Sequence, residues 1–168
     1  MVPAADAPAL LDEEHAAFIS GGLSILAASR DATNAPSIAR SHGCRVSPDR
    51  RRVTIYVARS QAGTLLDDVE RCGDLAVVFS FPPTHRTIQL KGGGATVRPP
   101  RPGETDHVAG YVAAFTANVV PFGYETRQMA TLFEFPEGDL VAIDFVPTGA
   151  FVQTPGPKAG APMAPATA

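Results

Sequence analysis

Three polar side chains that could hold a ligand recur at every second position of one predicted strand, residues 86–91. Because strand side chains alternate between two faces, Thr87, Gln89 and Lys91 share one face and their apolar neighbours share the other. Arg86 opens the strand on that other face and adds a cation at its start. A hydroxyl, an amide and an ammonium could together hydrogen-bond the polar edge of a ring and a phosphate. The alternative is an ordinary solvated outer face.

A second candidate set stands where a helix is predicted to begin, around residues 59–62. The free amides and the dipole of a helix N-terminus attract anions, so Ser60 and Gln61 could help to hold a phosphate there. Gln61 donates a hydrogen bond but supplies no charge, and Arg59 supplies one only if it turns inward. Alternatively, Ser60 is simply the residue that caps the helix.

A further cation lies near the end of an earlier predicted strand, residues 36–41. Arg40 has hydroxyl neighbours in Ser37 and Ser41, and the three groups could bind an anion together. The alternative is a surface arginine at a strand end. The four histidines are too scattered for metal-ligand spacing, so no metal site is predicted.

The composition predicts a single globular domain and argues against several classes of function. The chain has 168 residues, 45% of them hydrophobic and 18% charged. A net charge of −3 gives no basic field for nucleic acid. No apolar run approaches the roughly 18 residues of a membrane span, and no secretory signal opens the chain. Two cysteines, Cys44 and Cys72, do not make a disulfide framework, so we expect a cytoplasmic protein.

The elements that position these residues are mostly strands. We expect strands over 23–29, 36–46 with a kink at Gly43, 52–57, 75–79 and 86–97, and a final hairpin of 140–146 with 150–153. Helices are expected over 12–20, 61–71 and 103–118, with a shorter candidate at 124–132. Glycines 92–94 suit a bulge that bends the long strand.

Closure into a barrel would remove the exposed edges of so many strands. The predicted fold class is therefore mainly β (α+β), a six- to seven-stranded antiparallel barrel, closed or partly closed, with about three helices. The domain is expected over residues 11–153, after a flexible N-terminus at 1–10. Residues 154–168 are rich in proline and alanine and predict a disordered tail.

Between residues 51 and 97 the order is strand, helix, strand and long strand. This order resembles the FMN-binding split β-barrel family related to pyridoxamine 5′-phosphate oxidase, over roughly residues 11–153. The resemblance implies a split barrel that forms a homodimer, with each flavin at the subunit interface. It implies an FMN-dependent oxidoreductase that acts on an unidentified small molecule. The alternative is a non-catalytic protein that binds flavin, the deazaflavin F420 or haem.

The resemblance also gives roles to the candidate residues. Family members contact the isoalloxazine with a glutamine on the long strand; Thr87 stands at that position and Gln89 two residues on. They grip the flavin phosphate with Ser-Arg-Lys at a helix start, where Ser60 matches the serine and Gln61 replaces the first cation. Arg40 matches an arginine that the family places near the phosphate. The predicted cofactor-binding set is Arg40, Ser41, Ser60, Gln61, Arg86, Thr87, Gln89 and Lys91.

Overall fold

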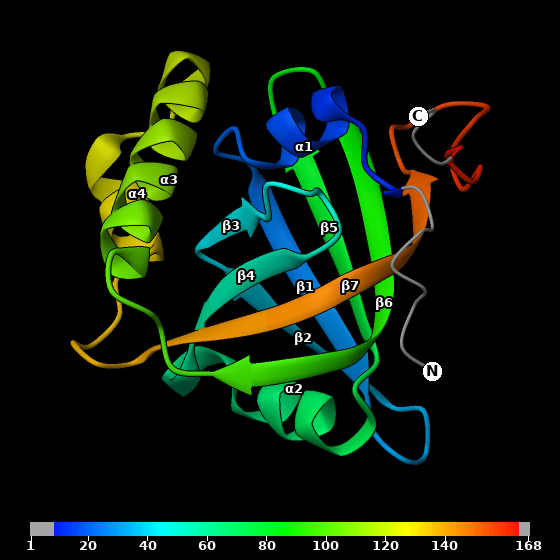
Figure 1. Ribbon diagram of the computed structural model, residues 1–168. Helices are drawn as coiled ribbons and strands as arrows, with labels where there is room; N and C mark the ends of the chain where they lie inside the picture. Colours follow the sequence, from blue (N-terminus) through cyan, green and yellow to red (C-terminus); the bar gives the residue numbers. More distant parts are fainter. Residues whose placement is uncertain (1–8, 165–168) are drawn as a thin grey trace.

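The computed structural model describes residues 9–164, which form seven strands, four α-helices and one short 3-10 helix (Figure 1). The strands are β1 (Ser24–Arg30), β2 (Pro36–Ser41), β3 (Gly43–Val46), β4 (Val53–Ala58), β5 (Leu75–Phe81), β6 (Arg86–Arg98) and β7 (Leu140–Val152). The helices are α1 (Glu13–Ile19), α2 (Arg59–Cys72), α3 (Glu104–Val119), η1 (Val120–Phe122) and α4 (Thr126–Leu132). The predicted fold class is confirmed, and the shorter helix that was a candidate at 124–132 is present as α4.

The strands form one antiparallel sheet that curls until its edges meet. The strand order is β2-β1-β5-β6-β7-β4-β3, so β2 and β3 lie at opposite edges. Only His42 separates these two strands in the chain, and its amide donates to the carbonyl oxygen of Tyr56 over 2.7 Å. One bent strand therefore serves both edges, which is the split-barrel arrangement.

Glycines bend the long strand β6, as the sequence predicts. The register of β6 against β7 shifts between Lys91 and Gly92 and again after Gly93. Gly92 lies so close to β7 that a Cβ atom there would stand 2.6 Å from the carbonyl oxygen of Val146. The predicted final hairpin is wrong, because β7 runs unbroken through Pro147, which lies opposite Gly92. The bulge lets the strand bend at the proline instead of turning back.

The core lies inside the barrel, and two helices close its ends (Figure 1). Ile19 of α1 seals one end, and Leu65 and Val69 of α2 seal the other. Each fully buried side chain of this size contributes roughly 1.5–3 kcal/mol. The fully buried strand residues include Ile25, Ile55, Phe79, Leu90 and Ile143.

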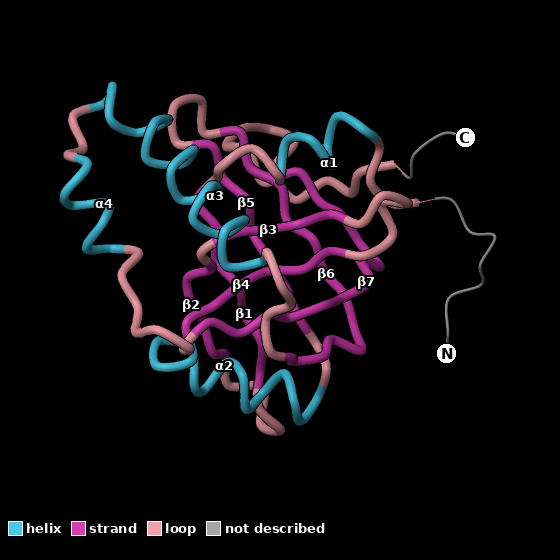
Figure 2. The backbone as a smooth tube through the Cα atoms, turned by 60° about the vertical axis from the view of Figure 1, so that its left-hand side comes forward, coloured by secondary structure: helices cyan, strands magenta, loops and turns pink. Residues whose placement is uncertain are grey.

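The helices α3 and α4 lie together at one side of the barrel (Figure 2). Helix α3 covers the outer face of the β3–β4–β7 half, where Tyr56 and Ala142 pack against Val108. Helix α4 packs against α3 through Met129. Strand β4 is consequently buried on both faces. Within residues 9–164, no helix combines the length and the apolar character needed to cross a membrane.

The two cysteines and the C-terminal segment complete the fold. Cys44 is buried and Cys72 half-buried, and both are free thiols.

Residues 154–164, predicted to be disordered, fold back along β7. There the amide of Met163 donates to the carbonyl oxygen of Ala150 over 2.8 Å, and its side chain packs on the core. This segment pairs with the end of β7, near Phe151. Strand β4 pairs only with the first half of β7, up to Phe145. The outer parts of the predicted flexible termini, residues 1–8 and 165–168, lie outside the described residues.

Candidate cofactor site

The outer face of the β2–β1–β5–β6 half carries a row of side chains in cross-strand register. Gln89 of β6 lies opposite Val78, Val78 opposite Leu26, and Leu26 opposite Arg40 of β2. Leu26 is 43% exposed, and Ile38 in the next row is 66% exposed. The middle of this face is therefore open to solvent. The face combines apolar surface with an amide at one end and, at the other, a guanidinium that packs on Phe133.

The predicted alternation of β6 is present in the structure. Ile88 and Leu90 are buried in the core, whereas Gln89 is partly exposed and Lys91 is exposed. The Oε1 atom of Gln89 accepts a long hydrogen bond of 3.4 Å from Gln153. No described residue accepts from the amide nitrogen of Gln89, so both of its protons are available to a ligand.

Thr87 and Lys91 flank Gln89 but differ in availability. The Thr87 hydroxyl donates to the His85 carbonyl oxygen over 3.0 Å and lies 2.9 Å from the Ser80 hydroxyl, so local partners engage it. The Lys91 ammonium lies 5.0 Å from the ring centroid of Phe151 and borders a hollow of about 610 Å³ on this face. Lys91 is therefore an exposed cation on the outer face, and Thr87 is largely a structural residue.

Arg86 lies apart from this group. Its guanidinium bonds Glu14 of α1 over 2.8 Å and stacks 4.3 Å above the ring of Phe18. Both contacts are with α1 at the end of the barrel. The structure therefore does not bring Arg86 to the outer row.

The start of α2 is already bound to a carboxylate of the chain itself. The amide of Ser60 donates to both carboxylate oxygens of Asp139, at 3.1 and 3.2 Å, and the Ser60 hydroxyl donates to one of them at 2.6 Å. Gln61 donates its side-chain amide to the carbonyl oxygen of Glu134 over 3.0 Å. Ser60 is therefore not the cap of α2; Asp139 supplies the acceptor that the first turn needs.

Ser41 and Arg40 are also engaged by the protein. Ser41 is 2% exposed, and its hydroxyl lies 2.9 Å from the carbonyl oxygens of both Gly43 and Tyr56. It holds the bend between β2 and β3 and has no proton left for a ligand. The Arg40 guanidinium lies 5.9 Å above the ring of Phe133. The structure thus places Arg40 beside the segment that follows α4.

A buried histidine in this region was not predicted as a site residue. His42 is 0% exposed, and the rings of Phe133 and Phe135 pack edge-on against it, with centroid distances of 5.6 and 4.9 Å. Neither ring nitrogen has a hydrogen-bond partner among the described residues. Burial lowers the pKa of the ring, and the nearby Gln61 side chain opposes that shift only in part. His42 is therefore held neutral, and only its place at a strand bend beside Gly43 could have drawn attention to it.

FMN is the cofactor that the sequence resemblance implies, and only its ring portion fits this arrangement. The outer row offers apolar surface and free donors, as a planar heteroaromatic ring requires. The phosphate does not fit the start of α2, because Asp139 already fills the anion position and Gln61 adds no charge. Among residues 9–164, moreover, no group of three or more His, Cys, Asp or Glu side chains could hold a metal ion.

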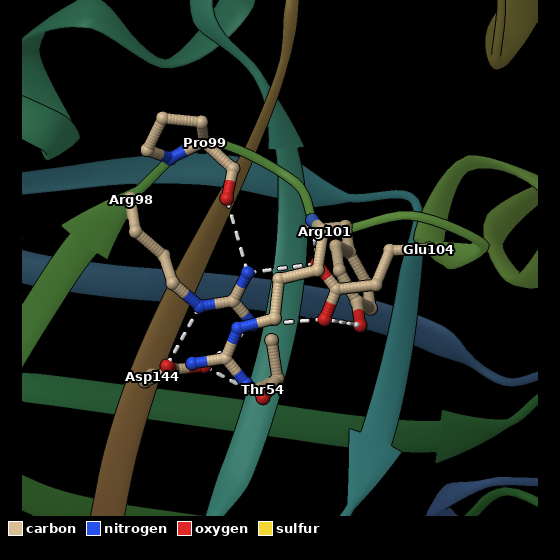
Figure 3. A network of polar contacts seen from close by, with 7 residues as sticks. Thr54, Arg98, Pro99, Arg101, Glu104 and Asp144 are labelled. Atoms are coloured by element: carbon tan, nitrogen blue, oxygen red, sulfur yellow. Dashed lines mark hydrogen bonds and ion pairs between the residues drawn. The ribbon is translucent and has the colours of Figure 1, made fainter.

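A second polar cluster, which the sequence did not reveal, lies on the covered half of the barrel (Figure 3). Arg98 of β6 bonds Glu104 through two contacts of 2.7 and 2.8 Å, and Asp144 through contacts of 2.8 and 3.2 Å. Thr54 and Tyr56 donate further hydrogen bonds to Asp144 and Glu104, respectively. Because the carboxylates are almost fully buried and fully bonded, the cluster ties α3 to the sheet and has no group free for a ligand.

These bonds change the pKa values of both carboxyl groups. Hydrogen bonds from Arg98 lower the pKa of Glu104 to about 2. Burial acts to raise the pKa of Asp144, but hydrogen bonds from Arg98 and Thr54 outweigh it, so that the net direction is downward. Both groups are therefore ionised at neutral pH.

A cavity of about 720 Å³ separates α3 from α4. Its walls are apolar and small, and no charged residue lines it. Phe133 and Phe135 form one wall, and the same two rings pack against His42. The cavity therefore adjoins the covered region beside Arg40 and His42, and does not open on the outer row.

Comparison with known proteins gives a structural likeness only. No protein-family model matches the sequence, and no curated protein matches it. Among solved structures, HupZ of Group A Streptococcus is similar with a TM-score of 0.54 and 15% identity, covering 89% of this chain and 100% of that chain. An F420 reductase has a TM-score of 0.54 and 13% identity, over 83% of this chain and 98% of that one.

A third structure links the likeness to the fold that the sequence predicts. It is a provisionally assigned pyridoxamine 5′-phosphate oxidase from Lactobacillus delbrueckii, with a TM-score of 0.52, 15% identity and coverage of 84% and 93% of the two chains. At such identities the similarity concerns the backbone arrangement. The strand order, the bent strand that serves both edges and these neighbours agree: the chain has the fold of the pyridoxamine 5′-phosphate oxidase-related split β-barrels.

Proposed function

We propose that this chain binds a flavin-type cofactor through its ring system, on the outer face of β2, β1, β5 and β6. The observation that carries the proposal is the uncovered row in which Leu26 and Val78 lie between Gln89 and Arg40. A planar heteroaromatic ring needs apolar surface beneath it and hydrogen-bond donors at its edge. The row supplies both, and the free amide protons of Gln89 are the donors that the ring would meet.

We propose further that two copies of the chain meet over this face. Leu26 and Ile38 leave an apolar patch in water on the face where the ring would lie. A twofold axis presents the same patch to itself, and this is the commonest way in which a chain covers such a surface. Light scattering at micromolar concentration should give twice the chain mass of 17.5 kDa. A monomer that still binds flavin would argue against a site shared between subunits.

The activity that follows from such a complex is FMN-dependent oxidation or reduction of a small molecule. When bound, the flavin supplies the hydride or electron transfer, and the residues of this chain bind and orient the ring. The second candidate is a non-catalytic holder of flavin, F420 or haem. The position of Asp139 favours this second candidate, because its carboxylate already accepts from the amide and hydroxyl of Ser60 that a cofactor phosphate would need.

The proposal is tested by ligand titration of the purified protein. Riboflavin, FMN, F420 and haem are titrated in turn and followed by absorbance and fluorescence. We expect flavin to bind, with FMN no tighter than riboflavin, because Asp139 holds the anion position. Gln89→Leu should weaken ring binding about five- to a hundredfold, the cost of a lost hydrogen bond to a buried polar edge.

The matched control is Thr96→Val, an exposed residue of the same strand beyond the glycine bulge. This variant should bind flavin as the unaltered chain does. If none of the four ligands changes the spectrum or the fluorescence, the cofactor proposal is wrong. If Gln89→Leu and Thr96→Val behave alike, the ring lies somewhere other than on this face.

A further inference from the structure

A hollow of about 610 Å³ lies on the outer face of β1, β5 and β6, beside the row that we propose for the flavin ring. Its central row consists of Lys91, Ala76 and Ala28, which lie opposite one another across the three strands. The row that begins at Gln89 is two residues away along each strand, which is about 7 Å. A ligand in the hollow would therefore lie next to a ring on the neighbouring row.

The hollow exists because the strands bring small residues to its floor. Ala28 and Ala76 carry only a methyl group, and Gly92 and Gly93 carry no side chain. The glycines that let β6 bend toward β7 thus also clear space on the outer face of the strand. A hollow of this volume is large enough for a small organic molecule.

One cation of the hollow has no carboxylate partner. Arg30 and Asp74 form an ion pair of 2.7 Å at its border, with both side chains about half exposed, so their charges cancel. The Lys91 ammonium contacts the ring of Phe151 and forms no ion pair with any carboxylate among residues 9–164. The charged residues that line the hollow therefore leave a net positive charge, on a chain whose net charge is −3.

Hydrogen-bond donors accompany this charge. The Arg30 guanidinium donates to Asn34 and Asp74, and its remaining N–H groups have no partner among the described residues. The Thr148 hydroxyl, which also lines the hollow, donates to the carbonyl oxygen of Lys91 only over a long contact of 3.4 Å. A carboxylate carries one negative charge and accepts several hydrogen bonds, so it matches a border of this composition.

We propose that the hollow binds the anionic group of a small organic acid, and that this acid is the substrate on which the flavin would act. The inference rests on the proposed function for the word substrate, whereas binding of an acid to the hollow can be measured without flavin. In this arrangement the carbon skeleton lies on the apolar floor, and Lys91 pairs with the carboxylate. The phosphate of the cofactor is another source of the same charge, and the experiment separates the two.

The test uses benzoate, a planar carboxylate, and benzamide, an uncharged molecule of similar shape. Dissociation constants for both are measured with the unaltered chain, Lys91→Met and Lys158→Met. Methionine is unbranched and carries no charge. Lys158 is the other lysine of the chain, and it is exposed and does not line the hollow.

We expect the unaltered chain and Lys158→Met to prefer benzoate to benzamide about two- to fivefold, which is the usual strength of an exposed ion pair. The preference should fall as salt is added, because salt screens exposed charges. Lys91→Met should show no preference.

A second variant, Ala76→Leu, tests the floor. A leucine side chain would fill the space between β1 and β6 and should prevent both molecules from binding. Its melting temperature should stay close to that of the unaltered chain, because Ala76 is partly exposed.

The outcomes decide between the claims. The acid subsite is refuted if the unaltered chain binds benzoate no better than benzamide, if Lys91→Met behaves like Lys158→Met, or if Ala76→Leu still binds benzoate. If Lys91→Met binds FMN more weakly but riboflavin as before, the hollow holds the phosphate of the cofactor and the substrate proposal is overturned. If benzoate binds as expected but no flavin binds any of the proteins, the acid subsite stands and the proposed function is wrong.

Discussion

Replacing Arg98 with methionine should be among the most damaging single changes on the covered half of the barrel. Its guanidinium makes four hydrogen bonds to Glu104 and Asp144, whose side chains are 3% and 8% exposed (Figure 3). Methionine keeps much of the side-chain volume but carries no charge and no donor. The variant would therefore leave two buried carboxylates without their cation.

Two independent estimates give the same size of effect. Removing one partner of a buried ion pair lowers the free energy of unfolding by about 3–5 kcal/mol. The pKa of Glu104 falls from 4.5 to about 2 in the folded protein, and that lowering alone corresponds to roughly 3 kcal/mol of stability at neutral pH. For a chain of this length, such a loss lowers the melting temperature by roughly 10 °C.

The assay is urea denaturation at pH 7 and at pH 3, at one fixed protein concentration. A carboxyl group with a lowered folded-state pKa contributes stability that is present above its unfolded pKa, here 4.5, and is lost as pH falls through about 2. The difference between the unaltered chain and Arg98→Met should therefore be largest at pH 7 and shrink in acid. The control Arg52→Met, which changes an exposed arginine directly before β4, should stay within about 0.5 kcal/mol. A loss below about 1 kcal/mol for Arg98→Met, or a difference that is equal at both pH values, would refute the reasoning.

Three further changes test the fold. Gly92→Ala should cost about 1–3 kcal/mol, because its Cβ would stand 2.6 Å from a backbone oxygen of β7. A Cβ at Gly93 would stand 3.9 Å from its nearest neighbour, so Gly93→Ala is the control, and equal urea midpoints for the two variants would contradict this. Deleting residues 155–168 should also cost about 1–3 kcal/mol, since Met163 packs on the core. An unchanged melting temperature would show that the segment does not stabilise the fold. His42→Leu should stabilise the fold by about 1–3 kcal/mol, because it removes two unpaired buried nitrogens. Because the folded-state pKa of His42 is lowered, the folded protein should lose stability as the pH drops below 6.5, the unfolded-state value. His42→Leu should remove this loss, and a steeper dependence of stability on pH in the variant would count against this account.

The sequence determined those features that depend on local geometry. In β6, the alternation that buries Ile88 and exposes Lys91 follows from the two-residue period of a strand. The bulge at Gly92 follows from the need for a residue without a side chain where two strands approach closely. The same reasoning failed at Pro147, where a residue typical of turns lies within a continuous strand because its partner strand bulges opposite it.

The state of the candidate site was decided only by tertiary structure. Gln89 and Arg40 stand in one row because β5 and β1 lie between their strands, and the strand order is a property of the whole sheet. Asp139 reaches Ser60 across 79 residues of chain, and no pattern around either residue announces the contact. The sequence shows the charge of Asp139, the hydroxyl of Ser60 and the start of a helix. Whether a helix terminus is free or already bound depends on which distant segment packs against it, and the packing of the whole core decides that.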